Sequence, residues 1–593
     1  MLEYHGNAVT ATEFLNALSG AVFPDPQLAD AQQRALDSAG QQPGSVLIGA
    51  FYGHLFGHAG SDGAELDLLE RAAALWSRGS ELYTELATVR ADLEHAMENP
   101  TAPGATDSFN NAALRAQTFG YALNALRPEI DALRADVVAF PHLPPHPRQG
   151  DLPTSQWDWG NLIHGRRTEA LIHTFLSTAA THEQRAFAAG AAAAYGANAR
   201  GSAYLGQVVG GPRRSHRHRD RLGRNSIGAW LAANHPSARP LPVYVGALPG
   251  ALSADLEQFV TDALTATFDT TATVSTPDLA AGYTRMLQHL SLLSRFNRPA
   301  LPSLPSGQWA MQVLSDPNSP VTSLRPQDTD IVGQDGGGVA VQYGSDPTPG
   351  SQQPGKSNST DANTVCGIIV AILILIDLIQ AFIQCIVQWA NDETCTFWQN
   401  MILEKLWEKD PPDPTDPGNP QSTSVTAQEL TAIAANPETA QFVWLLFDIH
   451  NMAWEAMDRA YNFLASTGLI MPDGLLGTPL YHQFTALPPY REQWPRRPEP
   501  TPVATYHLPP TSPIEYPARQ PSLFGAGSAP DVFVGEATAT ALTLWAQNAA
   551  GQTSGTNLDL DADRGVGHPC WTCRGSIDDD PVDVEILTYE EQR

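Results

Sequence analysis

The chain has 593 residues, which is enough for several domains, and 42% of them are hydrophobic, so large buried cores can form. It carries 34 Lys and Arg against 63 Asp and Glu, a formal net charge of −29 that argues against general nucleic-acid binding, because such binding needs cationic surfaces. The 47 glycines and 48 prolines predict long loops and linkers between the regular elements.

The N-terminal half predicts a helical domain at residues 1–298. Thr10-Ala-Thr-Glu13 has the capping-box pattern that opens a helix. Leu, Ala and aromatic residues then recur at helical spacing over residues 64–98, 112–139 and 167–199, and the alanine-rich part of the last stretch predicts a helix that packs closely at the centre of a bundle. The first residues lack the basic and apolar regions of a signal peptide, so we expect synthesis in the cytoplasm.

The middle of the chain combines two predicted linkers with one long apolar segment. Residues 299–364 are rich in Pro, Gly and Ser, and residues 391–425 contain the acidic, Pro-rich run DPPDPTDPGNP. Residues 365–390, between them, read VCGIIVAILILIDLIQAFIQCIVQWA. About 20 apolar residues span a hydrocarbon core of about 30 Å, so this segment predicts a transmembrane helix. The alternative is a buried core helix with one polar face.

A polar stripe marks one face of this apolar segment. Its members follow one another at helical spacing: Asp377, Gln380, Gln384 and Gln388. Polar groups are costly in lipid, so we expect the stripe to contact partner helices, which predicts an oligomer formed through this segment. Lys356 before the segment and Asp392 after it place the N-terminal domain in the cytoplasm by the positive-inside rule.

Residues 426–593 predict a small helical and loop-rich C-terminal region. A second capping box, Thr426-Ala-Gln-Glu429, precedes helical spacing over residues 442–466, and a further helix is predicted at 536–548.

Two short motifs follow near the C-terminus. The run DLDADRG alternates carboxylates as a calcium loop does, but Cys570 stands where the bidentate Glu of such a loop belongs. Cys570 and Cys573 form a CWTC pair, which predicts either a local disulfide or two reduced thiols in a turn.

Two clusters in the N-terminal domain carry chemistry. His54 and His58 are four residues apart, a spacing that chelates metal on a helix, although the adjacent glycines weaken a helix there. The segment 212–224 has six arginines: Arg213, Arg214, Arg217, Arg219, Arg221 and Arg224. Guanidinium grips phosphate with two parallel hydrogen bonds, so the segment predicts either phosphate docking or an internal ion-pair belt against the excess of carboxylates.

Two stretches carry a family resemblance. Residues 47–60 read LIGAFYGHLFGHAG, and residues 158–222 contain LIHGRRTEALIHTFL, AFAAGAAAAYGANARG and VVGGPRRSHRHRDRL. Together they resemble the zinc-dependent phospholipase C family, whose members are all-helical and related to single-strand nucleases. The resemblance implies a mainly α protein with an N-terminal bundle of this type, in which zinc ions would activate water and hold a phosphate.

The same resemblance implies that most of the metal site is lost. Its candidate zinc ligands are His54, His58, Asp158 and His164. Five further ligand positions of the family fall on or near residues that bind zinc poorly or not at all: Ala194, Asn198, Ser202, Arg221 and Arg224. We therefore expect no hydrolysis, and we expect the arginine segment to bind a headgroup at the former active-site mouth.

The combination of a phospholipase C-like domain, an apolar mid-chain helix and a C-terminal Cys-Trp module resembles proteins encoded beside bacterial contractile injection systems. This resemblance implies a non-catalytic accessory or cargo protein at a membrane, the inner membrane in particular, with lipids and injection-particle proteins as partners. The alternative is an active zinc-dependent phosphodiester hydrolase, in which Asp158, His173 or His216 joins His54 and His164. No cofactor is expected, and zinc and calcium are the two that the sequence leaves open.

Overall fold

The computed structural model describes residues 2–61, 63–140, 159–209, 213, 217–268, 276–304, 427–435, 437–472, 529–552 and 560. Within these residues the chain is helical and has no strand, which confirms the mainly α fold class. The predicted transmembrane helix at 365–390 lies outside the described residues. None of the helices that the structure describes has the length and apolar character needed to span a bilayer.

The chain divides into two compact units, each drawn from separate stretches of sequence. Unit 1 comprises Met1–Glu70, Val137–Arg295 and Leu464–Arg593, and unit 2 comprises Arg71–Asp136 and Phe296–Phe463. The stretches 1–298 and 426–593, each expected to form one domain, therefore both contribute to both units.

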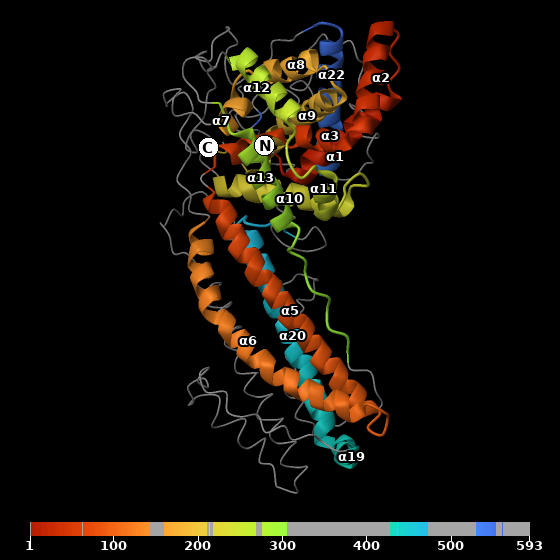
Figure 1. Ribbon diagram of the computed structural model, residues 1–593, viewed down its shortest axis with the longest axis vertical. Coiled ribbons are helices and arrows are strands. Elements are labelled where there is room, and N and C mark those ends of the chain that lie inside the picture. Colours follow the sequence, from red (N-terminus) through yellow and green to blue (C-terminus); the bar gives the residue numbers. More distant parts are fainter. Residues whose placement is uncertain are drawn as a thin grey trace, which may run out of the picture. The chain divides into compact units, whose positions relative to one another are not determined.

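The helices of each unit are shown in Figure 1. Unit 1 contains α1 (Tyr4–Gly20), α2 (Pro26–Gln41), α3 (Pro43–Ala50), α4 (Tyr52–Ala59), α7 (Trp159–Gly165), α8 (Thr168–Thr178), α9 (His182–Val209), α10 (Arg217–Asn234), α11 (Leu241–Ala247), α12 (Ala254–Phe268), α13 (Leu279–Leu293) and α22 (Ala529–Ala549). Unit 2 contains α19 (Ala427–Ala435) and most of α5 (Ala64–Glu98), α6 (Ala105–Ala139) and α20 (Pro437–Ser466).

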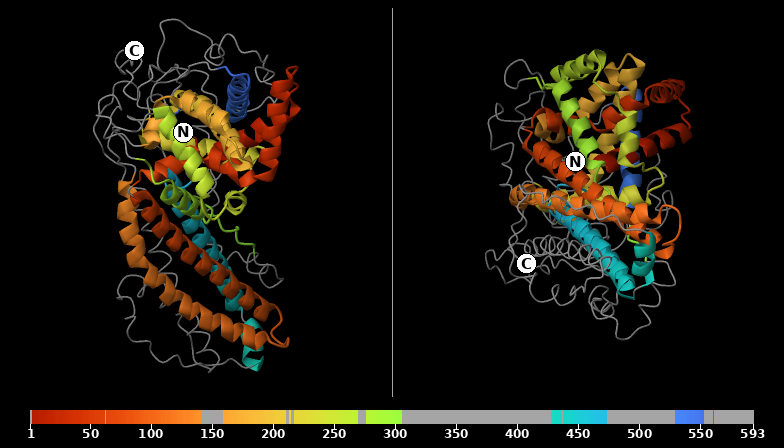
Figure 2. Two further views of the ribbon diagram at one scale, coloured as in Figure 1. Left: turned by 45° about the horizontal axis from the view of Figure 1, so that its top comes forward. Right: turned by 60° about the horizontal axis from the view of Figure 1, so that its bottom comes forward.

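Helix α9 is the central helix of unit 1, and small residues let other helices approach its backbone. A Cβ atom at Gly190 would lie 2.0 Å from the carbonyl oxygen of Val46 on α3. A Cβ atom at Gly196 would lie 2.2 Å from the carbonyl oxygen of Ala537 on α22, the helix drawn in blue in Figure 2. The predicted close packing of the alanine-rich helix is therefore confirmed.

Large aromatic side chains fill the space around α9 and α4. The largest fully buried ones are Tyr4, Phe14, Phe51, Tyr52, Phe56, Phe175, Phe187, Phe268 and Tyr283. Phe175 and Phe187 meet edge to face with ring centroids 5.1 Å apart. Burying one such side chain contributes about 1.5–3 kcal/mol, so this group supplies much of the stability of unit 1.

The start of α1 differs from the sequence prediction. Thr10 lies inside the helix, where its hydroxyl donates to the carbonyl oxygen of Gly6. The helix begins earlier because the preceding chain is fixed: Leu2 is fully buried, and its N–H donates to Asn198 Oδ1 at 2.7 Å. The prediction that Thr10 opens the helix is therefore wrong.

In unit 2, helices α5 and α6 run antiparallel and are joined by exposed ion pairs. Arg71 pairs with Asp136 and Arg78 with Glu129, both at 2.7 Å. Pro128 lies inside α6, which follows a bowed path in Figure 1, as expected where proline removes a helical hydrogen bond. Exposed pairs of this kind contribute little stability, so we expect more from the packing of α5 on α20, where the rings of Trp76 and Tyr461 have centroids 5.7 Å apart.

Candidate functional site

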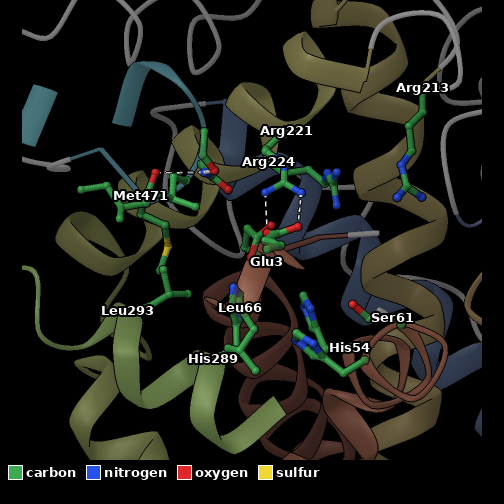
Figure 3. Close-up of a pocket in the computed structure, with 17 residues that line it drawn as sticks. Glu3, His54, Ser61, Leu66, Arg213, Arg221, Arg224, His289, Leu293 and Met471 are labelled. Atoms are coloured by element: carbon green, nitrogen blue, oxygen red, sulfur yellow. Dashed lines mark hydrogen bonds and ion pairs between the residues drawn. The ribbon is translucent and has the colours of Figure 1, made fainter. Parts of the chain in front are cut away.

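A cavity of about 190 Å³ lies in unit 1, where the arginine segment and the histidine pair meet (Figure 3). Its walls come from the residues before α1, from α4, the first turn of α5, α10, α13 and the turn after α20. The polar side chains that line it are Glu3, His54, His58, Ser61, Glu65, Arg213, Arg221, Arg224, Asn225 and His289. In Figure 3 the labelled arginines enter from the top of the view, and His54 and His289 from the bottom.

Arg221 and Glu65 form a two-pronged ion pair on one wall. Arg221 Nη1 donates to Glu65 Oε1 at 2.6 Å, and Nη2 donates to Oε2 at 2.8 Å. Burial alone would raise the pKa of Glu65, but the charge and hydrogen bonds of Arg221 hold it well below its ordinary value. Glu65 therefore stays ionised, and its pairing with Arg221 matches the planar geometry that guanidinium favours.

Asp220, which is almost fully buried, lies between two other arginines. Arg224 Nη2, one turn further along α10, is 2.8 Å from Asp220 Oδ2, and Arg213 Nε is 3.7 Å from the same oxygen. Partial burial and the like charges of Arg213, Arg221 and Arg224 lower the pKa of Arg217. Ion pairs of the kind that the second reading of the segment predicts are thus present, and the guanidinium groups of Arg213, Arg221 and Arg224 all line the cavity.

The histidines of the cavity are connected through Tyr4. The Tyr4 ring stacks on His54 with centroids 4.1 Å apart, and Tyr4 Oη shares a 3.0 Å hydrogen bond with His289 Nδ1. His54 Nε2 lies 3.0 Å from the carbonyl oxygen of Leu2. Since a carbonyl only accepts, His54 carries its proton on Nε2 and keeps the lone pair on Nδ1. The ring centroids of His58 and His289 are 5.0 Å apart.

These three imidazoles are uncharged near neutral pH. Burial, then the neighbouring His58 and His289, lower the pKa of His54 well below its ordinary value. Burial also lowers the pKa of His58 to about 4, with Arg285 adding to it, and that of His289 to about 3, with His58 adding to it. Burial raises the pKa of Glu3, although Arg224 opposes the change. The cavity therefore combines neutral imidazoles with permanent guanidinium charge.

The candidate metal ligands are only partly brought together. His54 and His58 both lie on α4, which Gly53 and Gly57 do not interrupt, and both line the cavity. His164 lies on α7, where its Nδ1 is 2.5 Å from the carbonyl oxygen of Gly160, and it does not line the cavity. Within the described part of the chain, no three His, Cys, Asp or Glu side chains are grouped so that they could hold a metal ion.

Several predicted residues lie outside the described part of the chain. They are Asp158, Arg214, His216, the stripe Asp377, Gln380, Gln384 and Gln388, and the pair Cys570 and Cys573. Arg217 and Arg219 lie in the first turn of α10.

Sequence reasoning missed His289, Glu65, Glu3 and Asn225. Asn225 donates from Nδ2 to the carbonyl oxygens of Gly468 and Ile470, both at 3.0 Å, and so fixes the turn after α20 as a wall of the cavity. Comparison of the chain with family models, curated proteins and solved structures finds no match. The resemblance to zinc-dependent phospholipases C therefore stays a prediction.

Proposed function

We propose that this protein associates with membranes without hydrolysing lipid, and that the arginine-lined cavity of unit 1 binds the phosphate of a lipid headgroup. The observation that carries this proposal is the convergence of Arg213, Arg221 and Arg224 on one cavity. Guanidinium groups favour phosphate oxygens, and cations at positions where the resemblance places zinc ligands repel Zn²⁺. The cavity volume of about 190 Å³ is several times the roughly 30 Å³ that one water molecule occupies, so the cavity has room for a phosphate group.

The test is titration of the full chain with glycerol phosphate, followed by calorimetry. Arg213→Gln is the most informative variant, because Arg213 is 3.7 Å from its carboxylate and its loss leaves the Arg224–Asp220 and Arg221–Glu65 pairs in place. A charged hydrogen bond contributes about 1.5–3 kcal/mol, so we expect about tenfold weaker binding or more. Arg34→Gln, at an exposed ion pair with Asp30, is the matched control and should bind as the wild type does. Equal binding by both variants would contradict the proposal.

Membrane association is assigned to the apolar segment 365–390. Replacing Ile374 and Leu375 by Lys should abolish sedimentation with membranes, because two charges at the centre of an apolar helix oppose insertion. The control is Val22→Lys, at a side chain that is 90% exposed. Unchanged sedimentation of the double variant would contradict the assignment of membrane association to this segment.

The relation to a contractile injection system rests on resemblance alone and is proposed as an accessory or cargo role. Co-purification of the tagged chain with sheath or baseplate proteins supports it, and a chain that fractionates only with free membranes argues against it.

A zinc-dependent phosphodiester hydrolase is the second candidate, favoured by one observation. His54, His58 and His289 are uncharged at the cavity, and neutral imidazole is the form that binds zinc. Mass spectrometry of protein purified without chelator distinguishes the two proposals: two or three zinc ions per chain would favour the enzyme, together with hydrolysis of a phosphodiester.

A further inference from the structure

The cavity of unit 1 has two polar walls of different chemistry. The arginine wall consists of Arg213, Arg221 and Arg224, and the imidazole wall consists of His54, His58 and His289. In Figure 3, His54 and His289 lie across the cavity from Arg221 and Arg224. The volume of about 190 Å³ leaves room beside a phosphate for further atoms of the same ligand. A phosphate on the arginine wall therefore leaves the imidazole wall to contact another part of that ligand.

The imidazole wall keeps hydrogen-bonding capacity for a ligand. Because His54 Nε2 donates to the carbonyl oxygen of Leu2 at 3.0 Å, His54 Nδ1 is left as an acceptor. His289 Nδ1 shares its 3.0 Å hydrogen bond with Tyr4 Oη, which leaves His289 Nε2. Among the residues that the structure describes, none forms a hydrogen bond with the ring of His58, which also lines the cavity. Each of the three rings can therefore bind a polar group of a ligand.

The charges of the cavity disfavour a ligand that carries a cation. Of its described lining residues, Glu3 and Glu65 are the two with carboxyl groups. Glu65 is already paired with Arg221 by two hydrogen bonds, and the charge of Arg224 acts on Glu3. The guanidinium groups repel a further positive charge, and a quaternary ammonium has no N–H to donate to an imidazole nitrogen. Phosphate esters of amino alcohols therefore match the cavity less well than phosphate esters of uncharged alcohols.

Hydroxyl groups are the uncharged groups that match the imidazole wall. A hydroxyl both donates and accepts, so it can bind a ring nitrogen of either tautomer. The ring centroids of His58 and His289 are 5.0 Å apart, which allows neighbouring hydroxyl groups of one ligand to reach both rings. Apolar side chains, among them Leu293, Ile470 and Met471, complete the lining and can contact the C–H groups of the same ligand.

We propose that this cavity selects a phosphorylated polyol, of which glycerol phosphate is the simplest, with its phosphate on the arginine wall and its hydroxyl groups on the imidazole wall. The inference rests on the proposed phosphate site and adds the class of alcohol that the phosphate carries. The same chemical group occurs free in solution and as the headgroup of a polyol phospholipid. The experiments below distinguish these two sources.

Calorimetric titration of the full chain with glycerol phosphate, phosphocholine and inorganic phosphate tests the class of alcohol without any variant. One neutral hydrogen bond changes affinity about threefold to tenfold, so glycerol phosphate should bind about tenfold more tightly than phosphocholine. If glycerol phosphate binds no more tightly than phosphocholine while inorganic phosphate still binds, this inference is wrong and the phosphate site stands. If none of the three binds, both this inference and the proposed function are wrong.

His58→Leu tests whether the imidazole wall causes the selectivity. Leucine removes the ring nitrogens without removing a hydrogen bond to a described residue, so glycerol phosphate should bind about threefold to tenfold more weakly and inorganic phosphate as before. His58→Gln, which keeps a donor and an acceptor, should restore part of the affinity. His95→Leu, at an exposed histidine in the last turn of α5, is the matched control. Equal weakening of both ligands by His58→Leu would contradict the inference.

Vesicles distinguish a lipid headgroup from a free polyol phosphate as the source of the ligand. The full chain is floated with vesicles of phosphatidylcholine alone and with vesicles that also contain phosphatidylglycerol, whose headgroup is a glycerol phosphate. Stronger binding to the second vesicles that His58→Leu removes would support the lipid headgroup as the ligand. If His58→Leu weakens binding of soluble glycerol phosphate but not of these vesicles, the result supports a free polyol phosphate.

Discussion

At the residue scale, the buried histidines of the unit 1 cavity stay neutral at pH values where the same histidines are protonated in the unfolded chain. The pKa values of His58 and His289, about 4 and about 3, lie below the ordinary value of 6.5. Between pH 6.5 and these lowered pKa values, the two histidines bind protons in the unfolded chain but not in the folded protein. The two histidines therefore make their full contribution to the free energy of unfolding above pH 6.5. This contribution falls as the pH drops through this window.

The expected fall reaches about 1.4 kcal/mol per pH unit for each histidine. Glu65 acts in the other part of the range: its lowered pKa stabilises the fold above its ordinary value of 4.5, and this contribution is lost only at more acid pH. Thermal unfolding measured between pH 6.5 and 4.5 thus reports on the histidines without the contribution of Glu65. His58→Gln should reduce the pH dependence in that window, and an unchanged slope would contradict the assignment.

Local sequence patterns predicted only part of this site. Spacing identified His54 and His58, and composition identified Arg221 and Arg224, because those signals lie within single short segments. His289 gave no signal of its own, since it sits in an ordinary amphipathic helix and reaches the cavity only through packing of α13 against α4.

At the element scale, the sequence predicts where a regular helix lies more reliably than where it begins and ends. Periodicity predicted α5 at residues 64–98, as observed, because its apolar stripe is continuous. The stretch 167–199 is interrupted between α8 and α9. Thr181 and Gln184 form a capping box there: Gln184 N–H donates to Thr181 Oγ1 at 3.2 Å, and Thr181 N–H donates to Gln184 Oε1 at 3.3 Å. That signal was present in the sequence but lay inside a longer helical pattern.

Where α3 crosses α9, adding a single methyl group should lower the stability of the fold strongly. Gly190→Ala would place a Cβ atom 2.0 Å from the Val46 carbonyl oxygen, so the backbones must separate. Overpacking of this kind costs about 1–3 kcal/mol or more, and we expect a lower midpoint of thermal unfolding.

Gly40→Ala is the matched control for this variant. Gly40 lies on α2 with no atom within 4 Å of its Cβ position, so alanine should stabilise the helix by about 0.5–1 kcal/mol. A parallel shift of both variants would mean that the close approach at Gly190 does not exist.

At the scale of the whole molecule, distant parts of the sequence complete one core. The C-terminal helix α22 belongs to unit 1, where Arg200 Nε on α9 donates to Thr540 Oγ1 at 2.8 Å. Asn548 Nδ2, near the end of α22, donates to the carbonyl oxygen of His173 at 3.2 Å. Sequence patterns could not show this, because α22 and α9 are each plain helical segments and only packing reveals which faces meet.

Unit 1 should therefore depend on α22, whose Thr540 follows its partner Arg200 on α9 by 340 residues. In a chain that ends at residue 528, α9 loses the partner that covers Gly196, and each large side chain that α22 buries removes about 1.5–3 kcal/mol of stabilisation. Arg200, which is 4% exposed in the folded protein, should then become open to trypsin. Limited proteolysis with mass spectrometry measures this cleavage directly.

A chain that ends at residue 552 is the control, because it keeps α22 and should protect Arg200 as the full chain does. Adding a peptide of residues 529–552 to the shorter chain should restore protection, since the helix then repacks against α9 without its covalent link. Protection of Arg200 in the chain ending at 528, without the peptide, would show that unit 1 closes its core without α22.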